Sequence, residues 1–166
     1  MDIKNKKLKI AVLTNDFICW GGGIAFIKHI IQGLIEAKKE TNIKLFLLIP
    51  FKEVKLPKFI EKNTRSLKKL FPLYLHRFQH NKEQEALFSE FKNYVEFIYY
   101  NPQNINVTLK KYKIDVLMPS MNVINKNCPA EWIGYLYDCQ HKYYPDFFTQ
   151  QEIEGRNNHF KNMIEQ

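Results

Sequence analysis

The chain has 166 residues, which is enough for one domain with a buried core. Its 45% hydrophobic and 25% charged residues exclude an intrinsically disordered protein, and no apolar run approaches the roughly 20 residues that span a bilayer. The net charge of +8 excludes an acidic protein, and three cysteines without a CxxC pair favour a reducing cytoplasm over a disulfide framework. The polar, basic residues 1–9 and the short apolar run after them predict no export signal.

The first fifty residues have the pattern of a βαβ unit. Leu8–Thr14 is a short apolar run that is typical of a buried parallel strand. The segment Asn15–Gly23 then predicts a loop that ends in three glycines. From Ile24 the apolar residues recur at helical spacing as far as the Lys38-Lys39-Glu40 cluster, and Ile43–Ile49 predicts a second strand.

The middle of the chain carries most of the positive charge. Residues 52–82 contain nine Lys or Arg and two Glu, an excess of seven, and large apolar residues alternate with the basic ones. Within this segment, Leu56–His80 predicts one or two basic helices. Such a pattern is typical of a surface that contacts anionic lipid or an acidic polymer, and equally of solvated helix faces in a lysine-rich protein.

Strands and helices continue to alternate in the second half. Two capping pairs, Asn81 with Gln84 and Thr149 with Glu152, predict helix starts. The alternation predicts an α/β fold: a Rossmann-like, mostly parallel sheet flanked by helices. The other predicted elements are strands at Val95–Tyr100, Ile114–Met118 and Trp132–Tyr137, a helix at Ile105–Tyr112, a loop at Asp138–Phe148 and a final helix that ends near Met163.

Ligands of such sheets bind beyond the carboxyl ends of the strands, where two loops carry unusual chemistry. In the first loop, the triplet Gly21–Gly23 allows close approach of a ligand to the backbone, and the helix that follows offers unpaired N–H groups to an anion such as a diphosphate. Glycines also form tight turns for structural reasons alone. The spacing fits neither the G-x-G-x-x-G fingerprint nor a P-loop.

The second loop contains a carboxylate, an amide and an imidazole. Asp138, Gln140 and His141 can fix hydroxyl groups by hydrogen bonds, and an imidazole can donate or accept a proton near neutral pH. A loop histidine can equally be an ordinary polar surface group. Cys128, Cys139 and His141 match no zinc-ligand spacing, so the sequence predicts no metal site and no cofactor.

The two loops together resemble a known family, and the resemblance spans almost the whole chain. The stretch FICWGGGI at Phe17–Ile24 resembles the start of the GT-B retaining glycosyltransferases of the family 4 type. The stretch WIGYLYDCQHKYYPDFF at Trp132–Phe148 is similar to a D-x-Q-H-x-x-x-P-x-F-F pattern in bacterial members. There a helix that begins S/T-x-x-E follows, as Thr149–Glu152 does here.

The resemblance implies roles for particular residues. Gly22 and Gly23 would lie against the donor diphosphate and the acceptor site, and His141 would be the catalytic-site residue that contacts the transferred sugar. Asp138 and Gln140 would shape the second loop and the acceptor pocket. The family's C-terminal domain supplies an E-x7-E motif, phosphate-binding basic residues and the nucleotide pocket. Residues 1–166 are therefore expected to be a single acceptor-side domain without its donor-binding partner, and inactive alone.

The implied function is transfer of a hexosyl group from a nucleotide-diphospho-sugar to a glycan or lipid-linked acceptor in the cytoplasm, with peripheral membrane contact through residues 52–82. One alternative is a non-catalytic α/β module that binds nucleic acid or another polyanion through the +8 charge. The chain contains no recognised nucleic-acid motif, so no nucleic-acid partner is expected. A dehydrogenase-like fold is the other alternative, and the glycine spacing disfavours it.

Overall fold

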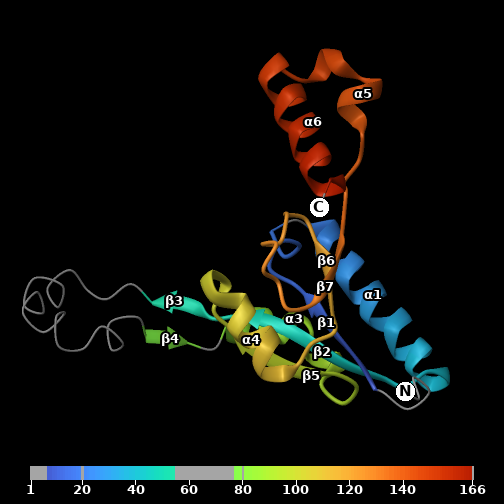
Figure 1. Ribbon diagram of the computed structural model, residues 1–166, viewed down its shortest axis with the longest axis vertical. Coiled ribbons are helices and arrows are strands. Elements are labelled where there is room, and N and C mark those ends of the chain that lie inside the picture. The colour runs from blue at the N-terminus through green and yellow to red at the C-terminus, as the bar shows by residue number, and fades with distance from the viewer. Residues whose placement is uncertain (1–6, 20, 55–76, 80, 166) are drawn as a thin grey trace, which may run out of the picture.

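The computed structural model describes residues 7–19, 21–54, 77–79 and 81–165. Five strands form an all-parallel sheet in the order β5-β2-β1-β6-β7, and β3 and β4 form a separate antiparallel pair (Figure 1). The strands are β1 (Leu8–Leu13), β2 (Ile43–Pro50), β3 (Lys52–Val54), β4 (Arg77–Gln79), β5 (Glu96–Tyr100), β6 (Val116–Ser120) and β7 (Glu131–Gly134). This confirms the predicted Rossmann-like α/β fold.

Strands β1 and β2 form the centre of the sheet because their side chains are apolar on both faces. They pair in parallel from Leu8 opposite Ile43 to Leu13 opposite Leu48, and β6 pairs with the other side of β1 from Val116. Residues 45–50 of β2 are all buried. A strand covered by helices on both faces requires such a continuous apolar run, which is why the sequence pattern identified both strands.

Helices cover the two faces of the sheet. On one face, Ile27 and Ile31 of α1 pack with Phe88 and Phe91 against β1 and β2. On the other face, Leu109 of α4 packs over the opposite side of the same strands. The helices are α1 (Gly21–Glu40), α3 (Lys82–Leu87), η3 (Ser89–Phe91), η4 (Pro102–Asn104), α4 (Ile105–Tyr112), α5 (Gln140–Tyr143), η5 (Pro145–Phe147) and α6 (Gln150–Ile164).

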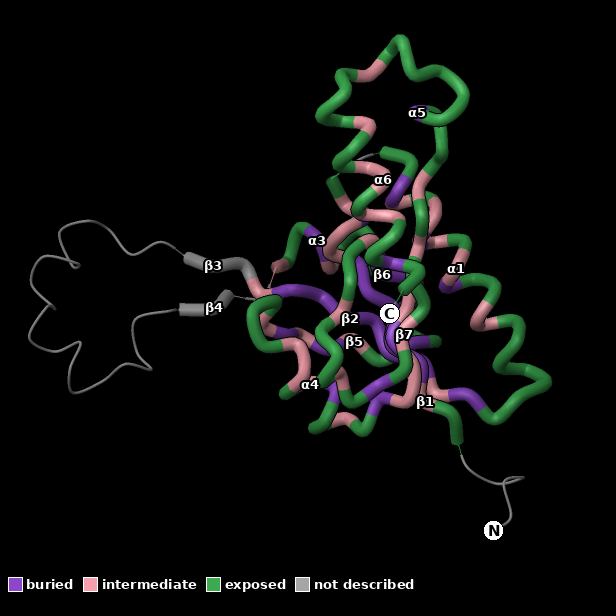
Figure 2. Tube along the Cα trace, turned by 45° about the horizontal axis from the view of Figure 1, so that its top comes forward, coloured by how far each residue is buried: buried purple, intermediate pink, exposed green. Residues whose placement is uncertain are grey.

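Beyond β7 the chain forms a helical projection, residues 138–164, which we call the α5–α6 unit. Figure 1 shows α5 at its far end and the last turn of α6 beside the sheet. There Met163 is buried, and a Cβ added to Gly134 would lie 2.8 Å from the Met163 methyl carbon, so α6 packs directly on the end of β7. In Figure 2 the buried residues gather along the sheet, whereas most of the projection is exposed.

Several predicted boundaries change. Helix α1 begins at Gly21, so the three glycines form its first turn and not a loop. Strand β7 ends at Gly134, before the predicted end at Tyr137, and the predicted loop at 138–148 contains α5 and η5. The predicted basic helix is wrong at Arg77–Gln79, which pairs with Lys52–Val54 as a strand. The rest of that prediction, residues 56–76 and 80, lies outside the described residues.

Candidate functional site

The direction of the chain connections reverses between β1 and β6. From β1 the chain moves to β2 on one side, and from β6 it moves to β7 on the other side. Loops that leave such neighbouring strands separate in opposite directions, and open α/β sheets bind their ligands at this point, beyond the carboxyl ends of the strands. The residues that directly follow β1 and β6 are therefore the first candidates for a site.

A hydrogen bond crosses the sheet at this position. The Asn122 side-chain Nδ2, just after β6, donates to Asp16 Oδ2, just after β1, over 3.1 Å. Asn15 Nδ2 also donates to Asp16 Oδ1, over 3.3 Å. Asp16 is half-buried and Asn122 is exposed, so the pair lies at the surface with a carboxylate and an amide facing each other. We call these two residues the switch-point pair.

The backbone beneath Asn122 is fixed by a buried serine. Ser120, which is 0% exposed, donates from Oγ to the Asn122 carbonyl over 2.7 Å and accepts from the Asn122 N–H over 3.3 Å. The Ser120 carbonyl in turn accepts the N–H of Tyr135 over 2.7 Å. These bonds fix the Asn122 backbone before any ligand binds, which reduces the entropy that binding would cost.

A second polar chain holds α3 to the same edge. The Thr14 hydroxyl donates to the Leu48 carbonyl over 2.8 Å and accepts from Gln84 Nε2 over 2.7 Å, while Gln84 Oε1 accepts from Asn81 Nδ2 over 3.0 Å. Asn81 also caps α3 by accepting the Gln84 N–H, which confirms the predicted capping pair. Thr14 and Gln84 are buried and mutually bonded, so their role is to hold the edge together.

Tyr100 ends β5 at this edge. Burial, and secondly the negative charge of Asp16, raise the pKa of Tyr100 well above its ordinary value. The phenol therefore keeps its proton across the physiological range. Asp16, after β1, thus acts on Tyr100 at the end of β5 through its charge and on Asn122 after β6 through a hydrogen bond.

The glycines that open α1 and the segment after β7 lie at the same edge, because both follow carboxyl ends of parallel strands. Three aromatic rings connect them: the ring centroids of Phe17 lie 5.4 Å from Phe26 and 5.5 Å from Tyr135, and Phe26 and Tyr135 are 4.6 Å apart. Phe17 is fully buried. Within the first turn of α1, Gly22 is exposed and Gly23 is buried. Their predicted contact with a diphosphate stays a prediction.

His141 lies elsewhere, within the α5–α6 unit. Its side chain is on α5, 1% exposed, and its Nε2 is 3.1 Å from Asn157 Oδ1 on α6. The rings of Phe148 and Phe160 enclose it at centroid distances of 6.4 and 5.5 Å. Among the described residues, His141 Nδ1 has no hydrogen-bond partner. The predicted contact of this imidazole with a sugar therefore requires α5 to move away from α6.

Asp138 and Gln140 lie at the start of α5. Asp138 Oδ1 accepts the Gln140 N–H over 3.2 Å and lies 3.7 Å from a guanidinium nitrogen of Arg156. The Arg156 guanidinium stacks on the rings of Phe148 and Tyr137 at 4.5 and 5.1 Å. Both Asp138 and Gln140 are exposed. The site residues predicted in the second loop thus lie together in the α5–α6 unit, separate from the switch-point pair. They are Asp138, Gln140 and His141.

The capping box that opens α6 gives a pH prediction. The backbone N–H of Thr149, then its hydroxyl and finally the charge of Arg156 hold the pKa of Glu152 below its ordinary value. The capping box therefore contributes fully to the stability of α6 above the ordinary pKa of Glu152. This contribution is lost as the pH falls through the lowered pKa of Glu152. A side-chain NMR titration should place the Glu152 midpoint below 4.5, and Thr149→Ala should raise it. Equal midpoints in the two proteins would contradict this.

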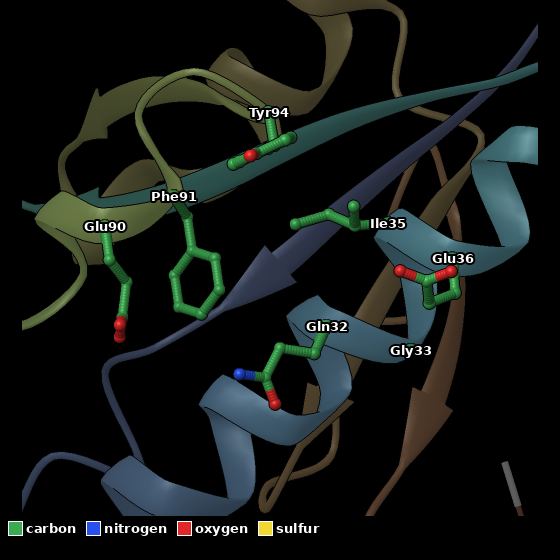
Figure 3. Close-up of a pocket in the computed structure, with 7 residues that line it drawn as sticks. All are labelled: Gln32, Gly33, Ile35, Glu36, Glu90, Phe91 and Tyr94. Atoms are coloured by element: carbon green, nitrogen blue, oxygen red, sulfur yellow. The ribbon is translucent and has the colours of Figure 1, made fainter.

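A groove of about 500 Å³ lies between α1 and η3, away from these residues (Figure 3). An ion pair between Lys28 and Glu90 at 2.7 Å and a hydrogen bond from Lys38 to the Tyr94 carbonyl at 3.2 Å connect its two walls. None of the site residues predicted from the sequence lines it. The lining residues are Gln32, Gly33, Ile35, Glu36, Glu90, Phe91 and Tyr94.

Within the described ranges, no three His, Cys, Asp or Glu side chains are placed to hold a metal ion together. Cys19, Cys128 and Cys139 are free thiols. No helix in the part of the chain that the structure describes has the length and apolar character needed to cross a membrane.

Comparisons with protein-family models, with curated proteins and with solved structures found no match to this chain. Sequence reasoning missed the switch-point pair, because the sequence marks the end of each strand but not that the two ends are neighbours in the sheet. Polar residues end the apolar run of β1 abruptly at Thr14, and Ser120 and Asn122 end the run of β6 in the same way.

Proposed function

We propose that the chain is the acceptor-side domain of a retaining glycosyltransferase. The reaction would transfer a hexosyl group from a nucleotide-diphospho-sugar to a glycan or lipid-linked acceptor in the cytoplasm. Residues 52–82 would contact an anionic membrane peripherally. Most of that basic segment, residues 55–76 and 80, lies outside the described residues, and its positive charge carries this part of the proposal.

One observation carries the proposal. A carboxylate and an amide meet at 3.1 Å where the sheet connections reverse, on the same edge as the glycine turn that opens α1. Hydroxyl-rich ligands are recognised by such polar side chains together with apolar ring surface, and Phe26 and Tyr135 supply partly buried rings beside the glycine turn. The resemblance of Phe17–Ile24 and Trp132–Phe148 to family 4 glycosyltransferases points to the same ligand class.

The chemistry divides between two domains in this proposal. The chain would bind and orient the acceptor at the switch point, and the first-turn N–H groups of Gly22 and Gly23 would face the donor diphosphate. Asp138 and Gln140 would position the turn after β7, and His141 would reach the transferred sugar after α5 moves. Departure of the diphosphate needs concentrated positive charge, which the proposal assigns to a donor-binding domain.

Saturation-transfer NMR on the full chain tests the proposal with three probes: octyl hexosides, UDP- and GDP-hexoses, and a single-stranded oligonucleotide. We expect saturation of the hexosides and little of the nucleotide sugars, whose nucleotide contacts would lie on the donor-binding domain. Salt-sensitive binding of the oligonucleotide without saturation of any hexoside would overturn the proposal and favour a polyanion-binding module.

A further inference from the structure

The switch-point pair has hydrogen-bonding capacity beyond the bonds it makes within the chain. A carboxylate offers about four lone-pair positions, and Asp16 uses two of them for Asn122 and Asn15. The Asn122 amide offers two N–H donors and an acceptor oxygen, and its bond to Asp16 uses one donor. Both side chains reach the surface, so a ligand can use what remains.

The free hydrogen-bonding groups of the pair, a carboxylate acceptor and an amide donor and acceptor, are complementary to two neighbouring hydroxyl groups. Each hydroxyl donates one hydrogen bond and accepts others. One hydroxyl can donate to the Asp16 carboxylate while its neighbour accepts from the Asn122 amide and donates to the amide oxygen. The 3.1 Å bond between the two side chains keeps the carboxylate and the amide next to each other, so that two adjacent hydroxyls can reach both.

The support beneath the pair is rigid, which favours recognition over a chance surface contact. Ser120 holds the Asn122 backbone through two hydrogen bonds, and the turn that carries Asp16 is closed by the bond from the Phe17 N–H to the Thr14 carbonyl at 3.1 Å. Thr14 itself is fixed by Gln84. Both elements of the site are therefore held in position by buried polar groups.

We infer that Asp16 and Asn122 form a binding site for a vicinal diol of a hexose, the part of the acceptor that this domain recognises. The choice of a hexose rests on the proposed function. Because the carboxylate bond is charge-assisted, Asp16 should contribute more to the affinity than Asn122.

The test measures the affinity of the full chain for octyl glucoside, galactoside and mannoside by NMR titration. Asp16→Asn should weaken binding of the preferred hexoside at least about tenfold, and Asn122→Ala about threefold to tenfold. Asp146→Asn and Asn158→Ala serve as matched controls, because both residues are exposed and lie in the α5–α6 unit. Deoxy analogues of the preferred hexoside identify the hydroxyls that Asp16 binds. Removal of such a hydroxyl should weaken binding to the parent chain but cost little further affinity in Asp16→Asn.

The outcomes separate this inference from the proposed function. If hexosides bind the parent chain and Asp16→Asn equally well, the switch-point pair does not bind the diol, while the proposed function stands. If no hexoside binds the parent chain, both are wrong. A loss of affinity in Asp146→Asn equal to that in Asp16→Asn would mean that net charge determines the effect, and would also overturn the inference. A thermal melt of each variant establishes that it is folded.

Discussion

Replacement of Phe17 by alanine is expected to lower the free energy of unfolding by about 3–5 kcal/mol. Phe17 is 0% exposed and contacts both Phe26 on α1 and Tyr135 after β7. Its truncation removes buried apolar area and leaves a cavity where the two turns meet. Urea denaturation followed by circular dichroism measures the change. The more conservative Phe17→Leu should cost less than about 2 kcal/mol, because it refills most of the space.

Phe147→Ala is the matched control, because the Phe147 ring in η5 is 82% exposed. We expect it to change the free energy of unfolding by no more than about 0.5 kcal/mol. If Phe17→Ala destabilised the chain no more than Phe147→Ala, the aromatic contact between the two turns would not contribute to the fold, and their placement at one edge would need another cause.

His141→Ala is expected to destabilise the α5–α6 unit by about 3 kcal/mol. The imidazole is 1% exposed, packs on Phe148 and Phe160, and pairs with Asn157, so truncation creates a cavity and leaves the Asn157 amide without this partner. Met163 in the last turn of α6 packs on Gly134 at the end of β7, far along the chain from His141, so the effect should be local. Hydrogen exchange should show about a hundredfold loss of protection in α6 and little change in β1 and β2.

His29→Ala is the control for this prediction, because His29 is exposed on α1 and its removal should leave α6 protection unchanged. The proposed contact of His141 with the transferred sugar gives a different result if it is the only role of this residue. A residue that serves only the ligand would leave α6 protection as it is in the parent chain and reduce hexoside binding. That result would contradict the structural role argued from its burial.

Features set by neighbouring residues could be predicted from the sequence. The capping box at Thr149 and Glu152 is such a feature, and so are the apolar runs of β1 and β2. Each is specified within a few residues, through a cap or a two-sided burial pattern. The parallel sheet followed from their alternation with helices.

Features that depend on distant residues could not be predicted. Asp16 and Asn122 are 106 residues apart, and only the order β1-β6 in the sheet brings them together. Gln84 was correctly placed at a helix start, but its bond to Thr14 spans 70 residues. The burial of His141 depends on α6, and no periodicity in the second loop indicated that α6 would fold back over it.

The most direct test of the site is a map of backbone amide shifts while the preferred octyl hexoside is added to the isotopically labelled chain. We expect the largest shifts at Asp16, Gly22 and Asn122, where β1 and β6 end and α1 begins. Shifts confined to the groove between α1 and η3, at residues such as Gln32 and Tyr94, would place the ligand in that groove and contradict the assignment of the switch point as the binding site.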